Sequence, residues 1–87
     1  MTTVVNKYKS KFDVYIGRPS IFGNPFSIGK DGDRAEVIKK FRTYFNTRIK
    51  KDAHFKQEVL KLKGKTLGCY CKPQDCHGDV IATYLDK

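Results

Sequence analysis

Apolar residues in the middle of the chain recur at the three- and four-residue spacing of a helix. From position 34 they form one stripe, made up of Val37, Ile38, Phe41, Tyr44, Phe45 and Ile49. This spacing predicts an amphipathic helix with one buried face. Asp33 and Glu36 form a capping-box pattern at its start. Asp52 is placed to cap a second helix, and Gly64 lies where a left-handed C-terminal cap is expected.

Other segments have the β-branched and aromatic composition of strands. Residues 12–16 end at Gly17, and residues 66–71 follow the second predicted helix. Residues 4 and 5, both valine, begin a third short β-type segment. A last helix is expected over about residues 76–86, with its apolar side chains on one side.

Strands that alternate with helices indicate an α/β fold. We expect a small single-domain sheet over residues 1–87, with at least two parallel strands flanked by about three helices. Loops that follow parallel strands meet at the same edge of the sheet, where open α/β sheets bind ligands. The Gly17–Gly32 loop and the Cys69–Asp79 motif are therefore expected to form a crevice.

Length and composition exclude several classes of protein. A chain of 87 residues is expected to be one domain, and it has no apolar run near the roughly 20 residues that span a membrane. The N-terminal residues lack the pattern of a secretory signal. The three cysteines lie within eight positions, unlike a secreted disulfide scaffold. We expect a cytoplasmic protein (in the host cytoplasm if a phage encodes it) with no membrane partner.

The net charge of +9 is concentrated in the predicted helices. Residues 34–65 carry eleven basic and three acidic side chains, whereas residues 1–33 and 66–87 are close to neutral. A basic surface attracts polyanions, although lysines on helix faces are often only solvated. One hypothesis is therefore a nucleic-acid- or protein-binding module that acts through helices 34–63, with Lys39, Lys40, Lys50 and Lys51 as the contact residues.

The first loop has residues suited to an anionic ligand. Arg18 directly follows a predicted strand and offers a guanidinium fork beside glycine backbone. Ser20 is a second candidate, and Asn24 has both a donor and an acceptor with which to read a base or ribose edge. A competing interpretation is that Asn24 and Pro25 form a tight turn while the phenylalanines cap the core. The loop lacks the Gly-Lys-Ser/Thr string of a P-loop.

The cysteine-rich motif has three interpretations. The first is a zinc site formed by Cys69, Cys71, Cys76 and His77, although structural zinc ligands usually come as C-x₂₋₄-C pairs from separated segments. The second is a reactive thiol at Cys76, whose pKa the helix N-terminus would lower. His77 would then be its base and Asp79 would orient the imidazole.

The third interpretation combines packing and binding. Cys69 and Cys71 would be small buried residues, because cysteine is among the most buried residue types. The backbone of residues 77–79 would receive a phosphate at the helix N-terminus, and Gly78 would permit its close approach. Cys76, His77 and Asp79 would then line the pocket.

Two strings carry a resemblance to a known family: VYIGRPS continuing to FGNPF over residues 14–26, and LGCYCKP continuing to CHGD over residues 67–79. Both resemble domain-of-unknown-function family 4326, which comprises small proteins and domains of phages and bacteria. Phe22 and Tyr70 stand where that family usually has tryptophan. The resemblance implies that both motifs belong to one site, and it implies no particular activity.

These observations predict a domain that binds a nucleotide-like or other phosphate-bearing small molecule in the crevice. The candidate ligand-binding residues are Arg18, Ser20, Asn24 and Gly78, and the candidate catalytic residues are His77, Cys76 and Asp79. No cofactor is expected, with zinc at the cysteines as the alternative. The sequence leaves open whether the ligand is turned over.

Overall fold

The computed structural model describes residues 1–87 and contains three strands and three helices. In chain order these are β1 (Thr3–Asn6), β2 (Val14–Tyr15), α1 (Arg34–Lys51), α2 (Ala53–Leu60), β3 (Thr66–Cys69) and α3 (His77–Leu85). β3 is the central strand, and both β1 and β2 pair with it in parallel. The expected α/β fold with parallel strands is confirmed.

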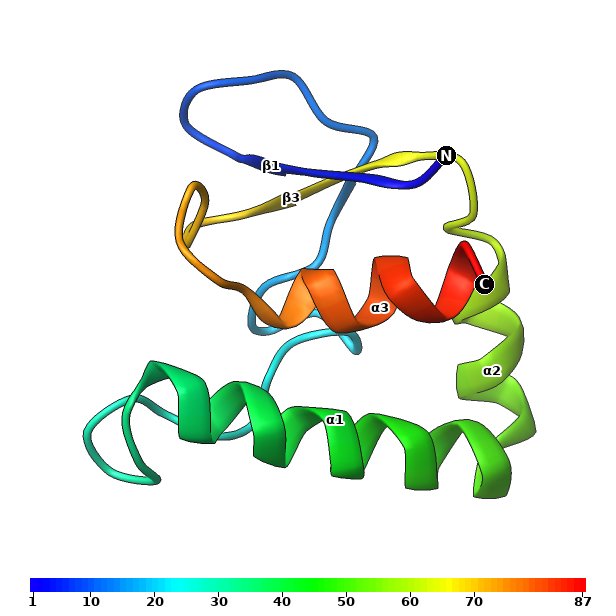
Figure 1. Ribbon diagram of the computed structural model, residues 1–87. Helices are drawn as coiled ribbons and strands as arrows, with labels where there is room; N and C mark the ends of the chain where they lie inside the picture. Colours follow the sequence, from blue (N-terminus) through cyan, green and yellow to red (C-terminus); the bar gives the residue numbers. More distant parts are fainter.

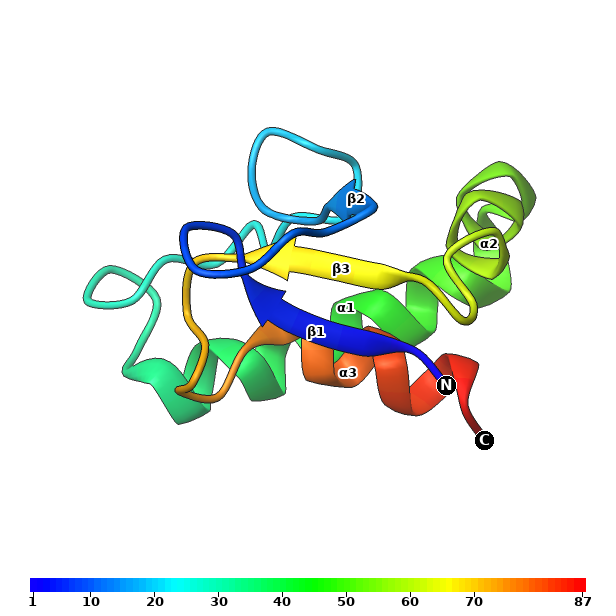
Figure 2. The same ribbon diagram turned by 90° about the horizontal axis from the view of Figure 1, so that it is seen from above.

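The helices all lie on one face of the sheet. Figure 1 shows α3 between the sheet and α1, with α2 at the end of α1 and leading back up to β3. In the view from above (Figure 2), the three strands lie side by side over the helices. On the opposite face, the ring of Phe12 covers Gly68 so closely that a Cβ there would stand 2.7 Å from the ring.

Alternation along β3 separates these two faces. Leu67 and Cys69 are buried on the helix side, where they join a core of phenylalanines and aliphatic side chains. The largest fully buried side chains of this core are Phe41, Phe45, Phe55, Ile16, Leu67, Ile81 and Val59. The amphipathic stripe of the 34–51 segment is therefore the core-facing side of α1.

The predicted N-caps of α1 and α2 are present. The carboxylate of Asp33 accepts the N–H of Glu36 at 2.9 Å, and Glu36 in turn accepts the N–H of Asp33 at 3.1 Å. Asp52 ends α1 and starts α2, with its carboxylate accepting the N–H of Phe55 at 3.0 Å. Gly64 has the left-handed φ of +79°, but α2 ends at Leu60 with Lys61 as its C-cap, so Gly64 belongs to the turn that follows and the expected cap at Gly64 is wrong.

Two of the predicted strands are longer than the observed ones. Within the segment 12–16 only Val14 and Tyr15 form the strand β2, although the N–H groups of Asp13 and Ile16 also donate to carbonyls of β3 at 2.8 and 2.9 Å. β3 ends at Cys69 rather than at position 71, so Tyr70 already belongs to the following turn. None of the helices is long and apolar enough to cross a membrane.

Candidate ligand site at the carboxyl edge of the sheet

A cavity of about 310 Å³ lies beyond the carboxyl ends of the strands. The loop after β2, the first turns of α1 and the segment after β3 all contribute to its lining. The structure thus brings together the two motifs that lie fifty residues apart in sequence. Of the predicted residues, the lining includes Arg18, Asn24, Cys71, Cys76 and His77.

Two arginines give this cavity a positive charge. Arg18 donates from Nη1 to the hydroxyl of Ser27 at 3.2 Å, and Arg34 donates from Nη1 to the backbone carbonyl of Asp75 at 3.2 Å. Each guanidinium has five N–H donors, so one hydrogen bond orients it and leaves others for a ligand. No ion pair in the structure involves either arginine.

Asn24 uses its amide to hold the loop together. Its Nδ2 donates to the carbonyl of Val37 at 3.2 Å, and its Oδ1 accepts the N–H of Phe26 at 2.9 Å. The side chain therefore ties the loop to α1 and fixes the turn before Phe26. Asn24 lines the cavity, and its side chain holds the turn together, as the competing interpretation of this loop expects.

Two of the predicted ligand-binding residues lie outside the cavity. The hydroxyl of Ser20 is buried and has no hydrogen-bond partner. Gly78 is packed against the strands, since a Cβ there would stand 2.7 Å from Ile16 and 2.9 Å from Val4. Its N–H points at the sulfur of Cys76 at 3.3 Å. Gly78 therefore allows α3 to approach the sheet closely, and its N–H already has a partner.

Asp79 is also directed elsewhere. One of its carboxylate oxygens accepts the backbone N–H of Cys76 at 3.1 Å and the other pairs with the ammonium of Lys72. It completes a capping box at the start of α3 rather than orienting His77. The expectation that Asp79 holds the imidazole is therefore wrong, because the cap and Lys72 take its carboxylate.

The imidazole of His77 is oriented by a backbone carbonyl. Its Nε2 lies 2.8 Å from the carbonyl oxygen of Ile16. Because a carbonyl oxygen only accepts, Nε2 carries the proton and Nδ1 has the lone pair in the neutral ring. Burial lowers the pKa of His77 below its ordinary value, so the ring is neutral at neutral pH. Nδ1 is 3.6 Å from the sulfur of Cys76.

Cys76 and Cys69 form a buried pair of thiols. Their sulfurs are 3.0 Å apart, and the S–H of Cys76 donates to Cys69. This hydrogen bond lowers the pKa of Cys69 to about 6, helped by the backbone N–H groups of Lys72 and Cys71. The same bond, together with burial, raises the pKa of Cys76. As the donor of the pair Cys76 keeps its proton, so this geometry favours Cys69 as the acidic thiol over Cys76, which the second interpretation named.

The structure has no group of three or more His, Cys, Asp or Glu side chains arranged to hold a metal ion. In the zinc interpretation Nδ1 of His77 would have to be the ligand atom, since Nε2 is hydrogen-bonded to the carbonyl of Ile16. Cys71 is half-buried in the cavity lining, whereas Cys69 lies behind it in the core.

Arg34 and Tyr70 are lining residues that the sequence reasoning missed. Arg34 is the first residue of α1, directly after the cap. A helix that starts where a glycine-rich loop ends places its first turn beside that loop. Tyr70 directly follows β3, the central parallel strand. Ligand-binding residues are expected at this position, just after the carboxyl end of a parallel strand.

Comparison with known proteins gives two matches and no solved structure. The family model described as "Domain of unknown function (DUF4326)" matches residues 3–87. A protein of Enterobacteria phage T4, described as "Uncharacterized 12.4 kDa protein in nrdA-td intergenic region", is 47% identical over 85 residues. That alignment covers 97% of this chain and 77% of the phage protein. No solved structure shows significant similarity to the chain.

Proposed function

This chain belongs to the DUF4326 family, whose description names no function, and we propose a function from the residues of the chain itself. The protein binds a nucleotide-like or other phosphate-bearing small molecule in the cavity between the two motifs. The binding groups are Arg18 and Arg34, and Asn24 shapes the wall beside them. The free cysteines favour the reducing cytoplasm as the compartment.

The observation that carries this proposal is the pair of arginines from two different elements at one cavity. Arg18 comes from the loop after β2 and Arg34 from the start of α1, and neither has a carboxylate partner. Guanidinium groups bind phosphate oxygens through paired, charge-assisted hydrogen bonds. Asp75 also lines the cavity but forms no ion pair with either arginine, so two positive charges against one negative charge favour an anionic ligand.

The size of the cavity limits the ligand. At about 310 Å³ it lies at the lower end of the roughly 300–1,000 Å³ that small-molecule pockets span. A single phosphorylated nucleoside or sugar is of suitable size, whereas a dinucleotide would extend well beyond the opening. We therefore place a mononucleotide-sized ligand there.

His77 is the group best suited to proton transfer at this site. Its Nδ1 has a free lone pair, and the carbonyl of Ile16 fixes the ring orientation. Cys76 adds a protonated thiol 3.6 Å away, and Asp79 acts only through the cap that positions Cys76. Any reaction of the bound ligand would therefore use His77 as the acid–base group, with Cys76 beside it.

A second candidate function rests on the lysines of α1. Lys39, Lys40, Lys50 and Lys51 are all exposed on one helix. Lys39 and Lys50 are eleven residues apart, as are Lys40 and Lys51, and eleven residues are about three helical turns. The two members of each pair therefore lie on the same side of the helix, about 16 Å apart along its axis. A basic strip of this kind suits the phosphate backbone of a nucleic acid.

The first function is tested by thermal unfolding in the presence of inorganic phosphate, ribose 5-phosphate and nucleoside monophosphates. A ligand at one hundred times its Kd adds about 2.7 kcal/mol to the unfolding free energy. For a domain of this size we expect the Tm to rise by about 10 °C or more. The variant Arg18→Gln should lose most of this shift, because a hydrogen bond to a charged group contributes about 1.5–3 kcal/mol.

Arg42→Gln is the matched control, since Arg42 is an exposed arginine of α1 that does not line the cavity. It removes the same charge and should leave the shift unchanged. A shift that is the same in the wild type and in Arg18→Gln, or that Arg42→Gln reduces equally, would contradict the proposed site.

A further inference from the structure

Three tyrosines gather at the carboxyl edge of the sheet, next to the cavity. Tyr8 follows β1, Tyr15 ends β2 and Tyr70 follows β3, so the three parallel strands bring them together. The rings of Tyr8 and Tyr70 are stacked with centroids 6.3 Å apart, and the ring of Tyr15 meets Tyr70 edge-on at 5.9 Å. We call these three residues the tyrosine cluster.

A single lysine lies over all three rings. The ammonium of Lys7 is 4.5 Å from the ring centre of Tyr15, 5.2 Å from that of Tyr8 and 5.3 Å from that of Tyr70. Burial and the neighbouring Tyr70 hydroxyl raise the pKa of Tyr15 to about 12, so its phenol is uncharged at neutral pH. The charge at the cluster is therefore positive.

Two rings of the tyrosine cluster are largely exposed to solvent. Tyr8 is 74% exposed and Tyr70 is 50% exposed. Exposed groups of large aromatic side chains in a small domain typically mark a binding surface. Aromatic rings beside cationic side chains are the combination with which proteins bind nucleobases and their phosphates.

Tyr70 connects the cluster with the cavity because it belongs to both. The hydroxyls of Tyr15 and Tyr70 lie 2.6 Å apart, and that of Tyr15 also donates to the carbonyl of Arg18 at 2.9 Å. The ring that would receive a base is thus fixed to the backbone of the residue that would bind the phosphate. A nucleotide has both groups within one molecule.

We propose that the ligand of this site is a nucleotide, with its base stacked on the tyrosine cluster at Tyr70 and its phosphate held by Arg18 and Arg34. This inference rests on the proposed function and adds the base to it. Lys7 supplies a further cation at the base-binding end. The nucleotide is either free or one unit of a single-stranded nucleic acid, since both present the same base and phosphate.

Binding of AMP and of ribose 5-phosphate to the intact protein, measured by titration calorimetry, tests the proposal. The two probes share the sugar phosphate and differ in the base. Stacking on an aromatic side chain contributes about 1–3 kcal/mol per base, so AMP should bind roughly 5- to 150-fold more tightly. Tyr70→Ala should weaken AMP binding much more than ribose 5-phosphate binding, so that the difference between the two probes disappears.

Tyr70→Phe is the matched control, because it keeps the ring and loses only the hydroxyl that contacts Tyr15. It should retain most of the preference for AMP. If ribose 5-phosphate binds through Arg18 and AMP binds no more tightly, the base proposal fails and the proposed function stands. If neither probe binds, or Arg18→Gln leaves both unaffected, the two proposals fail together.

A short 5′-phosphorylated single-stranded oligonucleotide distinguishes the two sources of the nucleotide. If a strand is the natural ligand, the oligonucleotide binds more tightly than AMP, and Tyr8→Ala weakens it more than it weakens AMP. If the free nucleotide is the ligand, AMP binds at least as tightly. Binding of the oligonucleotide that is unchanged in Tyr70→Ala would overturn the stacking proposal.

Discussion

The two buried sulfurs of Cys69 and Cys76 differ in proton affinity although they are the same chemical group. The difference arises because one donates the hydrogen bond between them and the other accepts it. The backbone turn after β3 adds its N–H groups to the accepting side. Residue type and helix position alone make an acidic Cys76 one of three interpretations, because the sequence does not show that the sulfur of Cys69 lies beside it.

We expect one thiol to ionise with a midpoint near pH 6, where an ordinary cysteine ionises at 9.0. Its pKa is lower in the folded than in the unfolded state. The ionised thiol therefore stabilises the fold fully above about pH 9, and this contribution is lost as the pH falls through about 6. Ultraviolet absorbance of the thiolate across this range measures the midpoint.

Cys76→Ala should raise that midpoint towards the ordinary value, since it removes the donor to Cys69. Cys71→Ala is the control: residue 71 contributes its backbone N–H, which alanine keeps, so the midpoint near pH 6 should remain. A wild-type protein in which every thiol titrates at or above its ordinary value would contradict the assignment.

At the level of elements, the start of α1 serves both stability and the site. The capping box of Asp33 and Glu36 fixes the first turn, and the first residue of that turn is Arg34. A loose first turn would leave the Arg34 guanidinium without a fixed position. Stability of this helix end and ligand affinity are thus linked.

Asp33→Ala should lower the free energy of unfolding by about 1 kcal/mol, the usual cost of losing an N-cap. It should also weaken binding of ribose 5-phosphate, because the turn that holds Arg34 frays. Urea denaturation and calorimetry measure the two effects. Asp33→Ser keeps a capping oxygen and should lose less of both, so equal losses in Asp33→Ala and Asp33→Ser would exclude the cap as the cause.

The helices could be predicted more accurately than the strands, because the signals that mark a helix lie close together in the sequence. Caps and apolar spacing lie within a few residues, so Asp33 and Asp52 correctly marked helix starts. Strand ends depend on partners elsewhere in the chain. Phe12 has strand-like character, but it covers Gly68 across the sheet, and only Val14 and Tyr15 form the strand β2.

Part of the candidate site could be located from the sequence, because parallel pairing alone brings the two motifs to one edge. The roles of individual residues could not be predicted there. Whether Asp79 points at His77 or at Lys72 depends on side-chain directions that no spacing reveals. The tyrosine cluster was missed for a related reason, since it draws one residue from the end of each strand.

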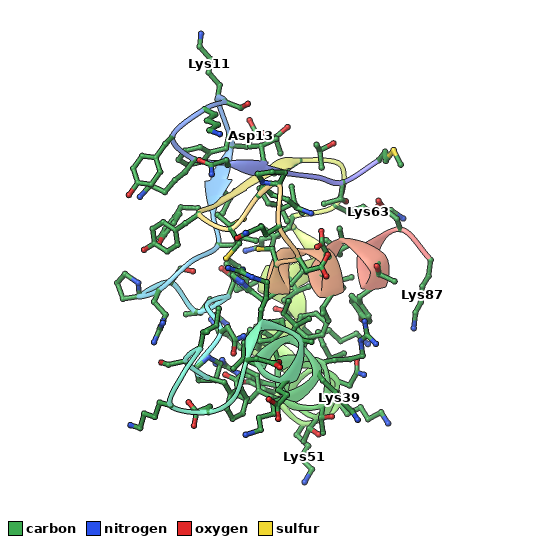
Figure 3. All side chains as sticks on the ribbon, turned by 60° about the vertical axis from the view of Figure 1, so that its left-hand side comes forward. Lys11, Asp13, Lys39, Lys51, Lys63 and Lys87 are labelled. Atoms are coloured by element: carbon green, nitrogen blue, oxygen red, sulfur yellow. The ribbon has the colours of Figure 1, made fainter.

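For the molecule as a whole, the charge is spread over several faces. Figure 3 shows Lys39 and Lys51 at one end of the molecule and Lys11 at the other, with Lys63 and Lys87 between them. The net charge of +9 therefore does not by itself mark one binding surface. A nucleic-acid surface on α1 must depend on where the charge lies, not only on how much there is.

The second candidate function predicts binding of duplex DNA that weakens steeply as salt is added. Reversing three lysines of α1 (K39E, K50E and K51E) should abolish it, while Arg18→Gln leaves it intact. Reversing Lys9, Lys11 and Lys30, which are also exposed, makes the same change in net charge and serves as the control. Fluorescence anisotropy measures DNA binding by the two triple variants. Equal losses of affinity would show that net charge, and not a surface on α1, is responsible for the binding.

The two ends of the chain lie next to each other (Figures 1 and 2). The backbone N–H of Thr2 donates to the carboxylate of Asp86 at 2.9 Å, and the Thr2 hydroxyl does the same. Both ends lie at the amino edge of the sheet, away from the cavity. The fold can therefore be spliced into a surface loop of another polypeptide through two adjacent joints, with its binding edge facing outward and unobstructed.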